Sequence, residues 1–253
     1  MSQEVYQYGQ GKVEIAAIVG GVIGDWRWLG DVSAMTLSIE EAKFTHTESY
    51  SGEKSEVREI TTGTTCSGSI TLQSMSAENV AQFTRGTNTE KAAGTVSEEP
   101  LGAVAAGDVL VLDDFGLSDI VVIDSAGTPA TIDPSHYEYD GYNELTFNSL
   151  PDPAPTMPLK VSYSHAAYKR VALLNGQKAD VALRYKGINL AEGNKKQYVE
   201  FYKVSPGLLQ NLELINNGQQ LAQSPVSFKP LKDTSKPADG ELGQFAQVVT
   251  VDY

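Results

Sequence analysis

The stretch Ala34–Glu40 (AMTLSIE) alternates apolar and polar side chains at successive positions. Side chains of a strand point to opposite faces in turn, so Met35, Leu37 and Ile39 would share one face. The same period of two returns in CSGSITL at 66–72 and in LKVSY at 159–163. This alternation predicts half-buried β-strands.

The pattern extends outward from these runs over most of the chain. Further strands are expected at 108–112, 119–124, 144–148, 179–186, 197–204 and 245–252. Turn-forming pairs such as Asp140-Gly141 and Gly193-Asn194 separate them. We therefore predict a mainly β fold, either a β-sandwich or a partly closed barrel.

One short helix is expected beside the strands. Ser76 is a good N-cap, Glu78 would lie in the first turn, and Gly86 would supply the stop. The segment 205–215 fits either a second helix or a strand at 211–215. Residues 224–240, which contain Pro and Lys, indicate an arm ahead of a closing strand.

Residues 45–63 (THTESYSGEKSEVREITTG) form a long polar segment between two well-patterned strands. The segment is too long for a tight hairpin turn, and long ordered loops are often functional. A solvated hairpin tip is the alternative, and the residue types by themselves favour it.

Length and charge narrow the classes of protein. The 253 residues fit one large β domain or a domain with an insertion. Acidic residues outnumber basic ones by 32 to 19, and the net charge of −13 disfavours binding to the phosphate backbone of a nucleic acid. The segment 92–159 contains no Lys or Arg, which predicts an asymmetric surface charge. The most apolar stretch, Ile15–Ile23, is too short for a membrane span, so we expect a protein made in a cytoplasm that does not enter a membrane.

Residues with catalytic or metal-binding chemistry do not form a recognisable set. The histidines, His46, His136 and His165, lack the spacing of a zinc site, and the lone Cys66 cannot form an intrachain disulfide. The acids from Asp113 to Asp124 do not match a calcium loop, so an acidic face is the preferred interpretation. We expect no enzyme activity, no cofactor and no metal.

The order of several short phrases resembles the major tail tube proteins of long-tailed bacteriophages over most of the chain. These phrases are Leu29-Gly30-Asp31-Val32-Ser33, the Glu48–Glu53 loop with its Ser-Gly, Ile60–Thr65, Ser76-Ala77-Glu78-Asn79, Tyr137–Asp140 with Glu144–Phe147, Val161–Ser164, Leu183–Asn189, Val199–Val204 and Leu231-Lys232-Asp233. No phrase is specific alone, but their order and spacing are. The sequence departs from the family pattern at Asp31, where Asn is common, and over the weakly matched residues 87–136.

The resemblance implies a single tail-tube domain over 1–253, with 87–136 as a decorated loop or small insertion and 224–253 as a C-terminal arm plus closing strand. Copies would assemble into rings, usually of six subunits, which stack into the virion tail tube that conducts DNA. The inter-ring loop would consist of Glu48, Ser49, Tyr50, Ser51, Gly52, Glu53, Lys54, Glu56, Arg58 and Glu59. Candidate acids for the lumen are Glu40, Asp180 and Glu200.

The implied partners are other copies of the chain and the tape measure, tail tip and terminator proteins, with DNA only as passing cargo. Assembly would take place in the cytoplasm of the bacterial host. Two alternatives stay open: a secretion-type tube of the Hcp kind or another tail component, and a carbohydrate-binding β domain of a tail tip. The second would need clustered exposed tryptophans, whereas only Trp26 and Trp28 are present.

Overall fold

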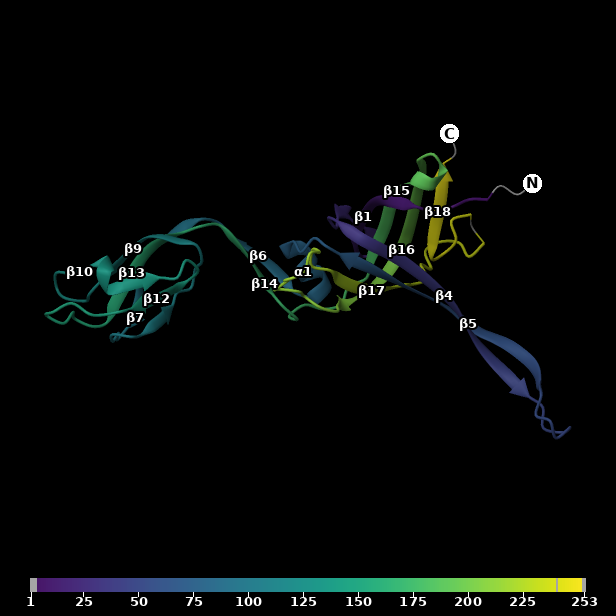
Figure 1. The fold of residues 1–253 in the computed structure, drawn as a ribbon, viewed down its shortest axis with the longest axis horizontal. Coiled ribbons are helices and arrows are strands. Elements are labelled where there is room, and N and C mark those ends of the chain that lie inside the picture. Colours follow the sequence, from purple (N-terminus) through teal and green to yellow (C-terminus); the bar gives the residue numbers. More distant parts are fainter. Residues whose placement is uncertain (1–3, 240, 252–253) are drawn as a thin grey trace. The chain divides into compact units, whose positions relative to one another are not determined.

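The computed structural model describes residues 4–239 and 241–251. Strands account for 53% of it and helices for 6%, so the fold is mainly β as predicted, but its sheets are not closed into a barrel. The chain forms two compact units rather than a single domain. Unit 1 comprises the described residues up to Thr87 and from Val171 onward, and unit 2 comprises Asn88–Arg170 (Figure 1).

Unit 1 is built on one nine-stranded sheet with the order β2-β1-β15-β16-β17-β5-β4, to which β3 adds on β1 and β18 on β16. All of these pairings are antiparallel. The strands are β1 (Gly9–Val19), β2 (Val22–Ile23), β3 (Arg27–Trp28), β4 (Val32–Thr47), β5 (Glu56–Leu72), β15 (Val181–Asn189), β16 (Lys195–Leu209), β17 (Ser224–Pro230) and β18 (Ala246–Val251). A 3₁₀ turn, η2 (Leu190–Glu192), joins β15 to β16.

The core of unit 1 follows from the alternation of its strands. Val13, Ile15, Ile70, Leu72, Leu183, Phe201, Val204, Val226 and Phe228 are among its buried members. Phe228 packs on Gly68, where an added Cβ would come within 2.2 Å of the ring. The helix α1 (Ala77–Thr84) contributes Phe83 to the same cluster.

Helix α1 begins as expected, with Ser76 accepting a hydrogen bond from the backbone N–H of Asn79. Its end differs, because Arg85 rather than Gly86 takes the left-handed conformation, with φ of 51°. Gly86 serves close packing instead, since a Cβ there would lie 2.5 Å from the carbonyl oxygen of Ala172. The buried Asn79 donates to the carbonyl oxygens of Leu29 (2.7 Å) and Ser74 (2.8 Å), which joins the helix to the sheet.

Unit 2 is a small sandwich of a four-stranded sheet, β10-β9-β13-β7, and a three-stranded sheet, β11-β12-β8. Its elements are β7 (Gly94–Gly102), β8 (Val109–Val111), β9 (Leu117–Ile123), β10 (Thr131–Ile132), η1 (Pro134–His136), β11 (Tyr137–Tyr139), β12 (Glu144–Phe147) and β13 (Leu159–His165). Val122, Leu145, Phe147, Leu159 and Val161 form its core. A two-stranded ribbon, β6 (Thr87–Lys91) and β14 (Tyr168–Ala172), carries the chain into unit 2 and out again.

Three sequence expectations are corrected. The second unit spans 88–170, well beyond the expected insertion at 87–136. The alternative helix at 205–215 is wrong, because β16 continues to Leu209 and no regular structure follows at 211–217. The arm expected at 224–240 begins as the interior strand β17, which pairs with both β16 and β5 and alternates buried residues from Ser224 to Pro230.

Candidate assembly surface

The β4–β5 hairpin runs far beyond the other strands of its sheet (Figure 1). At its root, Met35 and Ile70 are cross-strand partners that pack in the core. From Leu37 outward, every residue of β4 is exposed. The hairpin therefore stays in strand conformation through its backbone pairing and not through burial.

The outer part of this hairpin carries an exposed apolar pair. Phe44 and Ile60 are direct cross-strand partners on one face, and both are exposed. On the opposite face Lys43 Nζ lies 2.8 Å from Glu59 Oε1. An apolar pair on a ribbon without a core is a typical contact surface.

The tip of the hairpin closes on the carboxylate of Glu48. That carboxylate accepts hydrogen bonds from the hydroxyl of Ser51 and from the backbone N–H groups of Tyr50 (2.9 Å), Ser51 (2.9 Å) and Ser55 (3.4 Å). The hydrogen bond from the Ser51 hydroxyl, assisted by those backbone groups, lowers the pKa of Glu48 to about 2. Glu48 thus gives residues 48–55 a fixed shape and leaves Tyr50 86% exposed.

Part of the predicted interaction loop therefore lies in a strand. β4 continues to Thr47 and β5 resumes at Glu56, so Glu56, Arg58 and Glu59 lie in β5. Glu48, Ser49, Tyr50, Ser51, Gly52, Glu53 and Lys54 form the turn itself. These residues are contiguous in the sequence, which does not indicate that Glu48 is buried within them.

A cleft of about 920 Å³ opens beside the core of unit 1. One wall is a row of cross-strand partners, Val13, Tyr185, Val199 and Val248, and the other is the segment 31–37. β4 ends the sheet, and Val248 and Leu37 are 73% and 45% exposed. Along this side of the described molecule the hydrophobic core is left partly uncovered.

The three acids predicted for a lumen lie apart. Glu40 is exposed on β4, and the carboxylate of Asp180 lies 3.3 Å from Lys203 Nζ. Glu200 accepts a hydrogen bond from Gln247 and pairs across the sheet with Arg184. Because the face of Glu200 also carries Lys12, Lys186 and Lys196 by strand alternation, that face is of mixed charge.

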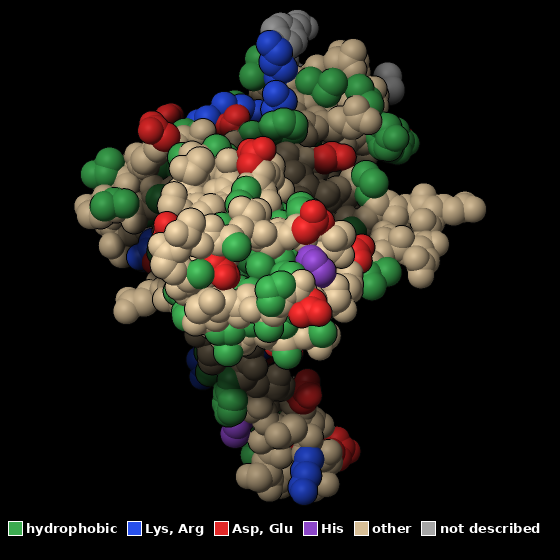
Figure 2. Space-filling view, turned by 90° about the vertical axis from the view of Figure 1, so that its left-hand side faces the viewer, with side chains coloured by type: hydrophobic (Ala, Val, Ile, Leu, Met, Phe, Trp, Pro, Cys, Tyr) green, Lys and Arg blue, Asp and Glu red, His purple; other side chains and the backbone are tan. Residues whose placement is uncertain are grey.

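Unit 2 presents acidic and hydrophobic side chains together on the face turned to the viewer in Figure 2. Asp114 and Asp124, which were expected on an acidic face, are instead buried, at 1% and 5% exposure. Asp124 organises a loop by accepting hydrogen bonds from the backbone of Ala130 (2.8 Å) and Thr156 (3.2 Å), and these bonds lower its pKa. The sequence contains no local signal that separates these two acids from the exposed ones.

Within the described residues, no three His, Cys, Asp or Glu side chains gather closely enough to hold a metal ion. Over the same residues, no helix has the length and hydropathy to cross a membrane.

No curated protein sequence matches the chain. A family model matches residues 6–249, which is nearly the whole chain and includes both units and the hairpin. The chain therefore belongs to the family described as "Protein of unknown function UCP028589".

Proposed function

We propose that this protein is the structural subunit of a tube, the major tail tube protein of a long-tailed bacteriophage. Copies join side by side into rings, the rings stack, and DNA passes through the opening. The resemblance of the ordered sequence phrases to that family supports this assignment, as does the match between its expected long hairpin and the β4–β5 hairpin.

The observation that carries the proposal is the pair of incomplete surfaces on unit 1. The hairpin displays Phe44 and Ile60 without cover, and the cleft beside Val248 leaves the core open. Because these surfaces lie at different places, contacts that use them join unlike faces of two copies. Such heterologous contacts close into rings or continue as filaments, as a stacked tube requires.

Edge strands support the same conclusion. Among the described strands, β4 has a neighbour on one side only, and β18 pairs only with β16. Natural proteins protect long open edges, because unpaired N–H and C=O groups recruit further strands. In a subunit made for assembly, those edges are the joints.

The acidic balance fits a conduit for DNA. A net charge of −13 repels phosphate, so DNA would move past the protein without adhering. Cations on the outer face of the sheet are partly neutralised, since Lys186 Nζ lies 3.1 Å from Glu14 and Arg184 is ion-paired with the same carboxylate.

A carbohydrate-binding role has less support. Glycan sites are usually lined by several exposed aromatic rings. Here Arg184 covers the ring of Trp26 at 4.1 Å, and Trp28, which is 52% exposed, has Lys12 at 5.1 Å from its ring. Neither residue lines the cleft described above.

Electron microscopy of the purified full chain tests the proposal. At high concentration, or after addition of a tail initiation complex, we expect rings or hollow filaments of uniform diameter. A protein that stays monomeric by analytical ultracentrifugation under both conditions would overturn the assignment. Binding on a glycan array in that monomeric state would favour the carbohydrate alternative.

A further inference from the structure

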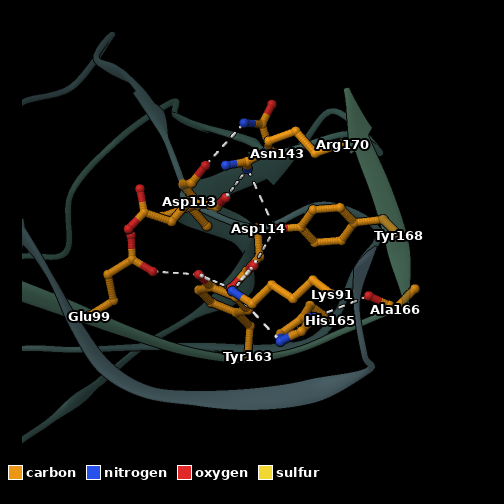
Figure 3. A network of polar contacts seen from close by, with 11 residues as sticks. Lys91, Glu99, Asp113, Asp114, Asn143, Tyr163, His165, Ala166, Tyr168 and Arg170 are labelled. Carbon is orange, nitrogen blue, oxygen red and sulfur yellow. Dashed lines mark hydrogen bonds and ion pairs between the residues drawn. The ribbon is translucent and has the colours of Figure 1, made fainter. Parts of the chain in front are cut away.

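The two strands that connect to unit 2 meet a buried carboxylate where they reach it. Lys91 is the last residue of β6, and Tyr168 is the first residue of β14. Both bind the same oxygen, Oδ1 of Asp114: Lys91 through its ammonium group, and Tyr168 through its hydroxyl at 2.8 Å (Figure 3). One acid thus holds both connecting strands.

Asp114 belongs to the body of unit 2. It lies in the segment between β8 and β9, and its side chain is 1% exposed. Its second oxygen faces the hydroxyl of Tyr163 at 3.4 Å and Nε2 of His165 at 3.9 Å, both from β13. A buried carboxylate is stable only when it is paired, so loss of its partners would be costly.

The neighbours of Asp114 hold the leaving strand at further points. The carbonyl oxygen of Asp113 accepts a hydrogen bond from Arg170 at 3.1 Å. The ring of Phe115 meets Tyr168 edge to face at 5.4 Å, and the guanidinium of Arg170 lies 5.7 Å from the Phe115 ring.

The last residue of the segment adds a backbone contact. The carbonyl oxygen of Gly116 accepts from the N–H of Ala166 at 3.1 Å. Each residue of the sequence Asp113-Asp114-Phe115-Gly116 therefore contacts the chain at or just before β14.

We propose that residues 113–116 are a clamp that fixes the connecting ribbon rigidly to the sandwich of unit 2. Rotation of either strand against the sandwich would leave the charge of Asp114 buried without Lys91 or Tyr168. The ribbon and unit 2 therefore move as one body, and any bending of the connection occurs on the far side of the clamp. This inference does not depend on the proposed tube function.

Trypsin tests the clamp because of an unusual distribution of cleavage sites. The connecting strands contain Lys91, Lys169 and Arg170, whereas residues 92–159 contain no Lys or Arg. The remaining site within unit 2 is Lys160, in the middle of β13. Cleavage at Lys160 reports unfolding of the sandwich, and cleavage at the other three sites reports release of the ribbon.

The test variant is Asp114→Asn in the full chain, and the matched control is Asp113→Asn, whose side chain is exposed. Site-resolved mass spectrometry of timed digests should show slow cleavage of the connecting strands in the wild type and in the control. Asp114→Asn should be cleaved there on the order of tenfold faster, with Lys160 still protected.

Two results would overturn the clamp. One is equal cleavage of the connecting strands in Asp114→Asn and Asp113→Asn. The other is cleavage at Lys160 that accelerates as much as cleavage at Lys91, because Asp114 would then support the whole sandwich. If Asp114→Asn does not fold, Tyr168→Phe removes a single hydroxyl and should still accelerate cleavage of the ribbon several-fold. Failure of that variant to do so would equally refute the proposal.

Discussion

Phe44 and Ile60 face each other across the β4–β5 hairpin, at 56% and 44% exposure, outside any core of their own chain. Replacement of both by Ser should leave the unfolding temperature nearly unchanged, since neither side chain is buried. Under the proposed function, assembly into rings or filaments should be lost, because the apolar contact would be missing. Sedimentation velocity and calorimetry on the same samples measure the two properties.

Thr45→Ala is the control for this pair, since Thr45 alternates to the other face of the same strand. It should assemble as the wild type does. Normal polymerisation of the Phe44→Ser/Ile60→Ser protein would show that this face is not a subunit contact.

Glu48→Gln should loosen the hairpin tip while the rest of the protein stays folded. The carboxylate binds Tyr50, Ser51 and Ser55, and a neutral amide accepts these hydrogen bonds less well. Amide exchange by NMR should show faster exchange at 50 and 51 in the variant. Glu53→Gln, an exposed change in the same turn, should show wild-type exchange.

The low pKa of Glu48 also determines the pH below which the hairpin tip should lose its structure. A carboxyl group whose pKa is lowered on folding stabilises the fold fully above about 4.5, and that contribution disappears as the pH falls through about 2. The amides of 50 and 51 should therefore remain protected at pH 3.5 in the wild type. Loss of protection near pH 4.5 would contradict the structure of the tip.

Gly68→Ala should destabilise unit 1, whereas Gly63→Ala should not. A Cβ at Gly68 would lie 2.2 Å from the ring of Phe228 and 2.7 Å from the carbonyl oxygen of Thr36. A Cβ at Gly63, in the same strand, would meet nothing within 4 Å. Overpacking of this kind typically costs about 1–3 kcal/mol, which denaturant unfolding of the two variants can resolve. Equal midpoints would exclude the predicted contact.

The two separate cores predict separable unfolding. Phe147 is fully buried in unit 2, and Phe228 is buried in unit 1. Phe147→Ala should lower the free energy of unfolding of unit 2 by about 3–5 kcal/mol, and Phe228→Ala should lower that of unit 1 by a similar amount. Each variant should therefore shift a different thermal transition to lower temperature. Differential scanning calorimetry measures both transitions, and a single transition that moves equally in both variants would show that the units unfold together.

Alternation predicted several of the strands that bury one face. It identified the segments at 66–72 and 159–163, whose inward residues Ile70, Val161 and Tyr163 lie in the cores. It could not follow β4 and β5 outward, because both faces there are exposed and the polar segment reads as a loop. In that region backbone hydrogen bonds between the strands take the place of a hydrophobic face.

Proline misled the prediction in the last third of the chain. Pro225 and Pro230 suggested an arm, although they lie in β17, an interior strand. Gly207 lies within β16, where a Cβ would come within 2.3 Å of the Ser227 hydroxyl, so close packing of neighbouring strands requires glycine there. Such requirements arise from tertiary contacts and leave no local pattern.

The candidate sites divide in the same way. The hairpin residues were predictable because they are contiguous, and Glu48 is separated from Ser51 by only two residues. Asp114 was not predictable, because its partners Lys91 and Tyr168 lie 23 and 54 residues away. In the sequence Asp114 is one of many acidic residues, and only its burial in the folded protein distinguishes it from the others.

Within unit 1, the N–H of Leu174 donates to the carbonyl oxygen of Thr84 (3.2 Å) and that of Gly176 to Arg85 (2.7 Å). The chain is thereby tied together immediately before it departs for residues 88–170 and immediately after it returns. A different domain whose N- and C-termini lie close together could replace residues 88–170 with little entropic cost of loop closure. Evolution could thus exchange one module while the large sheet and its hairpin remain unaltered.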